Sequence, residues 1–260
     1  MLRTAYGFIS ESELVDPFCP ASPIDSLPSH EFANCPTELS PKLAYFAGYF
    51  FGDGGLKNVE RSYLVSRRRE YKMIIADEFE SQMMFIQSLY SDLFGDCPPI
   101  RYERLSKGER TLYINPTSKR VYLFLTVLFE LPCGSKTNSL HAPAVVWNAP
   151  VELQRWFLRG LFDAEGDTRA VEGGFKSAPR VKIRMKCIPF IREVKSLFES
   201  AFGLKMNGPY LDPNNVSAYI QVERFSDIVF LAENHLFLHP VKQWRLAKTA
   251  EKLSLRTQRF

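Results

Sequence analysis

Two acidic residues, Asp53 and Glu165, occupy matched places in two similar segments of the sequence. Residues 46–54 read Phe-Ala-Gly-Tyr-Phe-Phe-Gly-Asp-Gly and residues 158–166 read Leu-Arg-Gly-Leu-Phe-Asp-Ala-Glu-Gly. Each acid thus ends an apolar, helix-like stretch and faces the negative end of a helix dipole. Two such carboxylates side by side repel each other, and a divalent cation would relieve both penalties. Clustered oxygen ligands favour Mg²⁺, with Mn²⁺ as a substitute.

The same two segments share a pattern of small residues. Ala44, Gly48 and Gly52 recur every four residues in the first segment, and Gly160 and Ala164 have this spacing in the second. Residues so spaced lie on one helix face, although a glycine inside a helix costs about 1 kcal/mol relative to alanine. Small faces let two helix backbones approach closely. We therefore expect the two helices to pack together and to bring the two acids side by side.

The elements that must position the acids recur in the same order along the chain. We divide the sequence into an arm, residues 1–40, and two similar halves, residues 41–150 and 151–260. Ser40 is a suitable N-cap for the first motif helix, and Pro41 suits its first turn. In the first half we then expect strands within 60–76, a helix over 78–94, strands within 99–114 and a helix over 121–131, and in the second half strands within 168–187, a helix over 190–202, strands within 205–222 and a helix over 225–234.

Charge is distributed unevenly along the chain. Residues 1–40 contain one basic and six acidic residues, whereas the whole chain has a formal net charge of +4, so residues 41–260 are strongly basic. A basic body favours a polyanionic partner. The arm also holds five of the 17 prolines, which indicates an extended, mostly irregular segment.

Composition argues against several protein classes. No apolar run reaches the ~18 residues of a membrane-spanning helix, and residues 1–15 lack the pattern of a signal peptide. The five cysteines are widely spread and include no CxxC pair, which argues against a disulfide scaffold and a zinc ribbon. We expect an intracellular protein of the cytoplasm, nucleoid or an organelle, not secreted and without a membrane partner.

The two acid-bearing segments, residues 46–54 and 158–166, resemble the paired motifs of the LAGLIDADG homing endonucleases in their single-chain form. The resemblance covers residues 41–260. It implies an α+β fold of two pseudo-symmetric αββαββα halves, in which the motif helices pack at the interface. The antiparallel sheets of that fold form a saddle on DNA.

The resemblance also implies an activity and a set of metal ligands. The last acid of each motif, here Asp53 and Glu165, would bind the catalytic Mg²⁺ ions, and the backbone carbonyls of Gly52 and Ala164 would contribute further oxygen ligands. The implied protein is a monomeric, metal-dependent endodeoxyribonuclease that cuts both strands of a long, asymmetric site in double-stranded DNA. A metal-activated water would attack each scissile phosphate in line. The family geometry places the cuts across the minor groove and leaves short 3′ overhangs.

Three positions depart from the family pattern. Phe51 stands where the first motif has its first acid, although the second motif keeps Asp163. That acid is structural in the family, so its loss leaves the catalytic pattern intact. Arg159 replaces a small residue, and we expect it to disturb local packing. Glu165 is one methylene longer than aspartate and keeps the metal-binding chemistry.

Two lysines are further candidates for catalysis. Lys136 lies in Gly-Ser-Lys-Thr, and Lys242 lies in His-Pro-Val-Lys. Both sequences resemble the lysine-bearing segment that follows the last helix of each family half, which would bring them near the acids. There they would stabilise charge on the scissile phosphate or polarise the attacking water; two exposed lysines at helix C-termini are the alternative. His141 and His239 lie near prolines in loops, and we assign them structural roles.

A run of alternating charge provides the best signal for DNA contact outside the motifs. Arg180, Lys182, Arg184 and Lys186 alternate with three apolar residues. Because successive side chains of a strand lie on opposite faces, the run predicts one basic face and one core face. Such a face suits phosphates, and a two-stranded ribbon can enter the major groove. Further candidates are Arg67, Arg68, Arg69, Lys72, Arg101 and Arg104 in the first half and Asn214, Asn215, Tyr219 and Gln221 in the second.

Rival functions within the same family stay open. Related scaffolds serve as RNA maturases that assist the folding of intron RNA, or as transcription regulators that bind without cutting. Acids retained in both motifs favour the nuclease, and we find no helix-turn-helix pattern, but a maturase could keep both acids. An intein is disfavoured, because the chain starts with neither Cys nor Ser and ends in Arg-Phe, not His-Asn.

Overall fold

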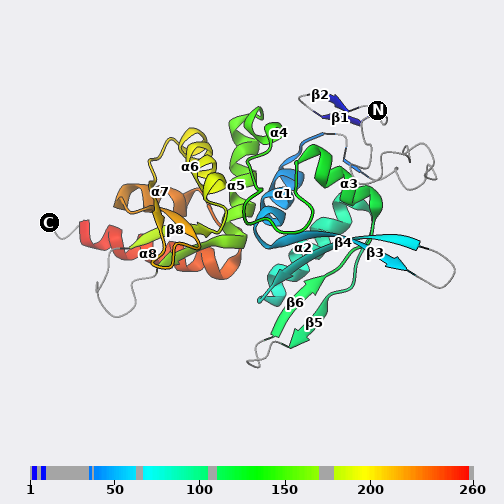
Figure 1. The fold of residues 1–260 in the computed structure, drawn as a ribbon. Coiled ribbons are helices and arrows are strands. Elements are labelled where there is room, and N and C mark those ends of the chain that lie inside the picture. Colours follow the sequence, from blue (N-terminus) through cyan, green and yellow to red (C-terminus); the bar gives the residue numbers. More distant parts are fainter. Residues whose placement is uncertain are drawn as a thin grey trace.

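Two halves of the chain repeat one order of elements: helix, two strands, helix, two strands, helix (Figure 1). The computed structural model describes residues 2–4, 7–9, 35–36, 38–62, 67–104, 110–169 and 179–257. The first half contains α1 (Pro41–Asp53), β3 (Gly54–Ser62), β4 (Arg67–Asp77), α2 (Glu80–Phe94), β5 (Arg101–Arg104), β6 (Arg110–Ile114) and α3 (Lys119–Leu128). The second contains α5 (Val151–Glu165), β7 (Gly166–Arg169), β8 (Arg180–Met185), α6 (Ile188–Phe202), β9 (Asn207–Leu211), β10 (Ala218–Val222) and α7 (Phe225–Glu233). The predicted α+β fold of two αββαββα halves is confirmed.

Four further elements lie outside this repeat. Strands β1 (Leu2–Thr4) and β2 (Gly7–Ile9) pair antiparallel within the N-terminal arm, most of which lies outside the described residues. The short helix α4 (Ala144–Trp147) precedes α5, and α8 (Pro240–Thr257) follows α7. The sequence pattern does not predict α8 as a helix. Within the described residues, no helix combines the length and apolar character needed to cross a membrane.

The two motif helices, α1 and α5, pack against each other through their small faces, as predicted. A Cβ added to Gly48 would lie 1.9 Å from the carbonyl oxygen of Phe157, and one added to Gly160 would lie 2.0 Å from that of Tyr45. Such distances leave no room for a side chain, since even 3.0 Å is essentially never observed. The glycines therefore set how closely the two halves approach.

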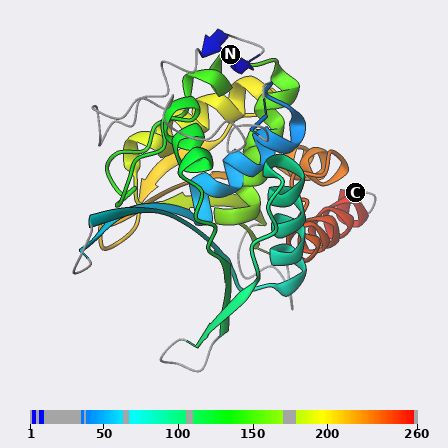
Figure 2. The ribbon, with the colours of Figure 1, turned by 90° about the vertical axis from the view of Figure 1, so that its right-hand side faces the viewer.

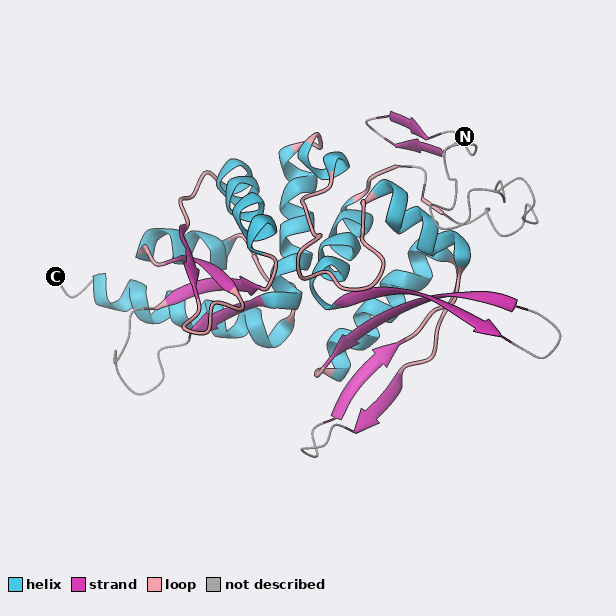
Figure 3. Cartoon of the chain, viewed as in Figure 1, coloured by secondary structure: helices cyan, strands magenta, loops and turns pink. Residues whose placement is uncertain are grey.

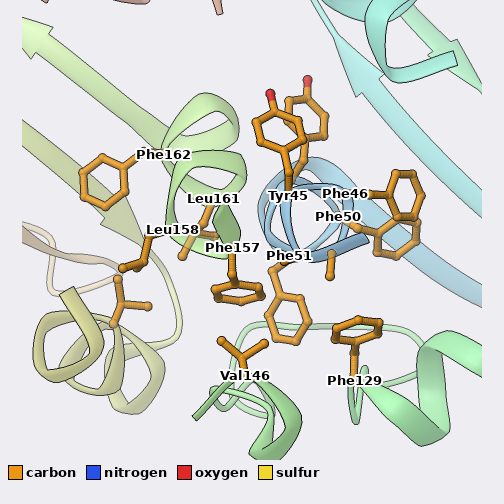
Figure 4. Close-up of a cluster of buried hydrophobic side chains, with 14 of the residues drawn as sticks. Tyr45, Phe46, Phe50, Phe51, Phe129, Val146, Phe157, Leu158, Leu161 and Phe162 are labelled. Carbon is orange, nitrogen blue, oxygen red and sulfur yellow. The ribbon is translucent and has the colours of Figure 1, made fainter. Parts of the chain in front are cut away.

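The rest of α1 and α5 carries the hydrophobic cores of the two halves. Around the crossing, Phe51 stacks edge-on against Phe157, with ring centroids 5.3 Å apart. In Figure 4, Phe46 and Phe50 point from α1 toward the first half, whereas Phe162 points from α5 toward the second. All five rings are at most 1% exposed. One continuous apolar cluster thus joins the halves and fixes the two helix ends relative to each other.

Each half contributes one antiparallel sheet of four strands. The strand orders are β3-β4-β6-β5 and β7-β8-β10-β9, which are the same order in the two halves. Figure 3 shows the helices and these two sheets, and Figure 2 shows the strands of the first half curving away from the helices. In β8 the apolar side chains of Val181, Ile183 and Met185 are buried toward the helices, and the residues between them are partly or fully exposed. Each sheet therefore has one core face and one open face.

Each motif helix passes directly into a strand through the glycine that follows its acid. Gly54 and Gly166 have extended backbones, and their N–H groups still donate to helix carbonyls. A Cβ on Gly54 would lie 2.4 Å from the ring of Phe50. At the other end of α1, the side chain of Ser40 accepts from the N–H of Leu43 at 3.2 Å, which is the predicted cap. Helix start and helix end are thus both set by local chemistry.

Candidate functional site

The two acids meet where the motif helices end. Asp53 is the last residue of α1, and Glu165 is the last residue of α5. The crossing of the helices brings these ends together, because a Cβ on Gly52 would lie 2.4 Å from Cβ of Ala164 and 2.9 Å from Cγ of Glu165. The two carboxylates therefore come from opposite halves and repel each other.

Burial makes the charged forms of both acids unfavourable. It raises the pKa of Asp53 to about 7, and the charge of Glu165 adds to this rise, whereas Lys242 and Lys136 oppose it. Burial also raises the pKa of Glu165 against the opposing effect of the two lysines. A pair of carboxylates in this state gains from a bound cation.

Both predicted lysines lie at the ends of the motif helices. The Nζ of Lys136 donates to the carbonyl oxygens of Phe50, Phe51 and Gly52 at 3.3, 2.8 and 2.6 Å. An ammonium group at a helix C-terminus is favourable there, because it faces the negative end of the dipole. Burial nevertheless lowers the pKa of Lys136 to about 8.

Lys242 repeats this arrangement at α5. Its Nζ donates to the carbonyl oxygens of Asp163 and Ala164, the latter at 3.0 Å. Both lysines also affect the pKa of Asp53, which places them within electrostatic reach of the acids. Both lysines hold helix C-termini, as in the structural alternative, but their ammonium groups are partly buried and not exposed.

Two pockets of similar construction flank the acid pair. One, the Glu165 pocket, has a volume of about 400 Å³, and the other, the Asp53 pocket, has a volume of about 300 Å³. Each contains one of the two motif acids, the residue before the acid of the opposite motif, and the lysine that binds that residue's carbonyl. These residues are Glu165, Gly52 and Lys136 in one pocket and Asp53, Ala164 and Lys242 in the other. Both halves of the chain are therefore needed to build either pocket.

Comparisons with known proteins agree with this geometry. Residues 152–208 match the family model described as a LAGLIDADG-like domain. The whole fold is similar to that of I-DmoI in complex with DNA and Ca, with a TM-score of 0.57 and 19% identity. That likeness covers 80% of this chain and 98% of I-DmoI. The fold is that of the LAGLIDADG homing endonucleases.

Two other LAGLIDADG structures support the assignment. A variant of I-SmaMI and I-GzeII in complex with its DNA target match with TM-scores of 0.56 and 0.55, at 12% identity each. These likenesses cover 84% and 85% of this chain and 91% of each of the other chains. At such identities the likeness concerns the fold, and it confirms the resemblance that the two motifs predict.

Curated relatives match only a segment of their own length. The chain is 25% identical over 124 residues to the probable translation initiation factor IF-2 of Methanocaldococcus jannaschii. It is 26% identical over 163 residues to the glutamine–fructose-6-phosphate aminotransferase of the same organism. The matched segments make up 9% and 13% of these proteins, so the chain spans about a tenth of their length.

The departures from the LAGLIDADG motif have structural explanations. Asp163 is buried, and its Oδ2 accepts from the hydroxyl of Tyr45 at 2.6 Å and from the N–H groups of Leu238 and His239 at 3.0 and 3.1 Å. It thus ties α5 to the start of α8. Burial raises the pKa of Asp163 to about 6, although these hydrogen bonds oppose the rise. Phe51 fills the matching place in α1 with an apolar contact.

The expectation that Arg159 disturbs local packing is wrong. Its guanidinium donates to the carbonyl oxygens of Asn234 and His235 at 3.1 and 3.2 Å, just after α7. It also lies over the ring of Trp156, 4.7 Å from the centroid. The side chain therefore lies away from the helix crossing and binds the end of a neighbouring helix.

The two histidines have different surroundings. His239 lines the Asp53 pocket, but its Nδ1 accepts from the N–H groups of Val241 and Lys242 at 3.2 and 3.4 Å and so caps α8. Its ring also stacks edge-on against Phe79. His141 lies at the surface, 3.4 Å from the carboxylate of Glu130. His141 and the Nδ1 of His239 thus make structural contacts, whereas the buried Nε2 of His239 has no hydrogen-bond partner among the described residues.

The basic run of β8 lies on the open face of its sheet. Arg184 and Lys186 are exposed, and Arg180 and Lys182 are partly exposed. Tyr219 lies beside this run, with its ring centroid 5.9 Å from Nζ of Lys182 and 6.0 Å from the guanidinium carbon of Arg184. This surface combines cations with an aromatic ring.

The other candidates for DNA contact are less uniform. Gln221, a predicted DNA contact, is 5% exposed and donates to Glu223, so its amide is not available at the surface. Asn214 and Asn215 are exposed and shape the turn between β9 and β10, where Asn214 accepts from the N–H of Val216 at 3.2 Å. Lys72 pairs with Glu70 at 3.0 Å.

The remaining arginine candidates of the first half lie on β4 and β5. Arg101 is exposed at the start of β5. Arg67, Arg68 and Arg69 begin β4, and Arg104 ends β5. The side chains of these four residues lie outside the described part of the structure.

Two acidic residues of the Asp53 pocket were not predicted from the sequence. Asp77 is the last residue of β4, Glu78 follows it, and both line the pocket. Asp77 accepts from the hydroxyl of Tyr49 and from the N–H of Phe79, the latter at 2.7 Å. In the sequence, the one signal for these two acids is that they follow a predicted strand. The repeat does not predict them, because the matching place in the other half is the end of the basic run of β8.

Proposed function

We propose that this protein is a site-specific, divalent-metal-dependent endonuclease that cuts both strands of a long DNA target. The observation that carries the proposal is the pair of matched pockets, each with an acid, a carbonyl oxygen and a lysine. A duplex offers two scissile phosphates related by approximate two-fold symmetry. Two pockets related in the same way suit one cut in each strand.

The donor atoms of both pockets suit Mg²⁺. Carboxylate and carbonyl oxygens are the ligands that this ion prefers, and Mn²⁺ accepts the same set. Asp53 and the carbonyl of Ala164 would hold an ion in one pocket, and Glu165 and the carbonyl of Gly52 in the other. The raised pKa of Asp53, due to burial and to Glu165, supports a place for a cation. When bound, the ion would supply an activated water and neutralise charge at the phosphate. The related I-DmoI has been observed with DNA and Ca and with DNA and Mn.

The two lysines would serve the phosphate directly. Each ammonium group is held at a helix end by two or three carbonyl oxygens, so its position is fixed before DNA arrives. A preorganised cation stabilises the negative charge that develops in the transition state without the cost of reorganisation. Lys136, with a pKa lowered by burial to about 8, could also exchange a proton with the attacking water.

DNA would lie along the open faces of the sheets. The basic residues of β8 and Tyr219 would contact phosphates and sugars, and the long strands of the first half would follow the other part of the target. One chain contains both pockets and both sheets, so a monomer suffices. Because the halves differ in sequence, the target should be asymmetric.

The segments that match in the two curated relatives are better explained by a mobile element than by the named function of either protein. Two proteins of unrelated name contain a segment similar to this chain, and the segment is a small part of each. The genetic element that encodes a homing endonuclease moves between sites in DNA, so its relatives are expected in unrelated contexts.

Selection of cleavage sites from a randomised DNA library in Mg²⁺ tests this function. We expect one long sequence to be recovered with breaks in both strands. A protein that binds DNA or intron RNA and cuts neither would support a maturase or a regulator instead, and would overturn the nuclease.

A further inference from the structure

The two pockets can be compared residue by residue through the registers of their sheets. Gly54, which follows the first acid, pairs with Ile75 of β4, and Gly166, which follows the second acid, pairs with Ile183 of β8. Ile75 and Ile183 are therefore equivalent. The three residues after each isoleucine line the pocket of their own sheet: residues 76–78 the Asp53 pocket and residues 184–186 the Glu165 pocket.

The two sets of equivalent positions have net charges of opposite sign. In the Asp53 pocket they are Ala76, Asp77 and Glu78, and in the Glu165 pocket they are Arg184, Met185 and Lys186. Glu78 and Lys186 are direct counterparts, and both are exposed at the rim.

Together with the acids and lysines, the linings differ strongly. The Asp53 pocket has three carboxylates and one lysine, and the Glu165 pocket has one carboxylate and three cationic groups. Asp212 lies 3.2 Å from Arg184 and offsets one of these cations. The cations of Lys136 and Lys186 remain around Glu165, and both act on its carboxylate.

We propose that the two pockets bind the divalent ion in different ways, an inference that rests on the proposed nuclease function. The Asp53 pocket binds its ion before DNA, because Asp77 and Glu78 attract a cation. The Glu165 pocket attracts the scissile phosphate first and gains its ion only once that phosphate has offset the charge of Lys136 and Lys186. The two strands are then cut in a fixed order, and at limiting metal only the strand in the Asp53 pocket is cut.

Binding of Mn²⁺, followed by electron paramagnetic resonance without DNA, tests this directly and does not depend on activity. We expect one tight site, which Asp53→Asn abolishes and Glu165→Gln retains. Glu78→Lys, which copies the charge of the other pocket, should weaken this site by roughly three- to ten-fold. Glu80→Lys is the matched control, because Glu80 is exposed on α2 and does not line the pocket. Lys186→Glu should create a second site that binds Mn²⁺ without DNA.

Cleavage of a supercoiled plasmid that carries the selected target supplies a second measurement. At limiting Mn²⁺ we expect nicked circles cut in one strand, and Glu78→Lys should remove this strand preference. Two equal Mn²⁺ sites without DNA, or equal effects of Glu78→Lys and Glu80→Lys, would overturn the inference and leave the proposed nuclease standing. Absence of acid-dependent Mn²⁺ binding with DNA as well as without it would overturn both.

Discussion

At the scale of single residues, Asp53 should make the stability of the metal-free protein depend on pH. Burial and the charge of Glu165 raise its pKa to about 7 in the folded state, against about 3.9 in an unfolded chain. Between these values the folded state keeps a proton that the unfolded state has released. The stabilising contribution is therefore complete at low pH and is lost as the pH rises through about 7.

The variant Asp53→Asn removes this loss. We predict that it raises the free energy of unfolding of the metal-free protein at about pH 8 by roughly 1–3 kcal/mol and has little effect at about pH 4. Urea unfolding in the presence of a chelator measures both values. Glu80→Gln is the control for loss of an exposed carboxylate. If wild type and Asp53→Asn lose stability equally as the pH rises, Asp53 is not the group responsible.

The lysines should act on different strands. Lys136 lines the Glu165 pocket and Lys242 lines the Asp53 pocket. We predict that Lys136→Met and Lys242→Met each slow cleavage of one strand by about 10²-fold, and that the affected strand differs between them. Single-turnover assays with one labelled strand at a time measure this, and each variant is the control for the other. Equal slowing of both strands by both variants would contradict the assignment of one lysine to each pocket.

The residues predictable from the sequence are those fixed by the repeat. Asp53, Glu165, Gly52 and Ala164 stand at the ends of two similar segments, so their meeting follows from helix packing alone. Asp77 and Glu78 were not predictable in the same way. The two strand pairs that follow the motifs differ in length, so positions counted from each acid lose their equivalence. Only the observed register shows which residues correspond.

At the scale of elements, the crossing of α1 and α5 should tolerate no added side chain. A Cβ on Gly160 would lie 2.0 Å from the carbonyl oxygen of Tyr45, an atom that moves only with its helix. We predict that Gly160→Ala lowers the free energy of unfolding by roughly 3 kcal/mol. Gly55→Ala is the control, because its Cβ would meet only a side-chain carbon of Ile74 at 3.2 Å. Equal urea midpoints for the two variants would show that the crossing can open at little cost.

Most elements were predictable because their apolar periods are clear, but α8 was not. Its buried stripe is narrow and consists mainly of Leu246, Ala250 and Leu253. The stripe is surrounded by charged residues, so the segment looks mostly polar. Its start is set by a local cap from His239 and by a tertiary contact, in which Asp163 binds the chain just before the helix. The contact with Asp163 joins residues far apart in the sequence, so the sequence pattern does not reveal it.

At the scale of the whole molecule, DNA affinity should depend on salt through the open face of β8. Each cation that neutralises a phosphate releases counterions, which adds about one to the slope of log affinity against log salt. We predict that Arg180→Gln and Lys182→Gln each reduce this slope by about one. Lys205→Gln is the control, because Lys205 is exposed in the turn before β9. Unchanged slopes for both strand variants would place the DNA elsewhere.

The arrangement of the whole chain was predictable at the level of two similar halves. A basic body and paired motifs indicated a DNA-binding surface made of both halves. Which polar and basic residues share that surface depends on side-chain pairing and burial, as with Lys72, which pairs with Glu70, and Gln221, which is buried. Each of these two side chains binds a glutamate two positions away in the chain, and only the folded structure shows that this pairing forms.

The claim that both pockets are needed to break a duplex is tested most directly by strand-resolved cleavage of the selected target. Wild type, Asp53→Asn and Glu165→Gln are compared in Mg²⁺, and binding to the same DNA is measured in parallel. We predict that all three proteins bind the target with similar affinity, that the wild type cuts both strands and that neither variant does. Double-strand cleavage by either variant, or equal binding by all three without any cleavage, would contradict the account.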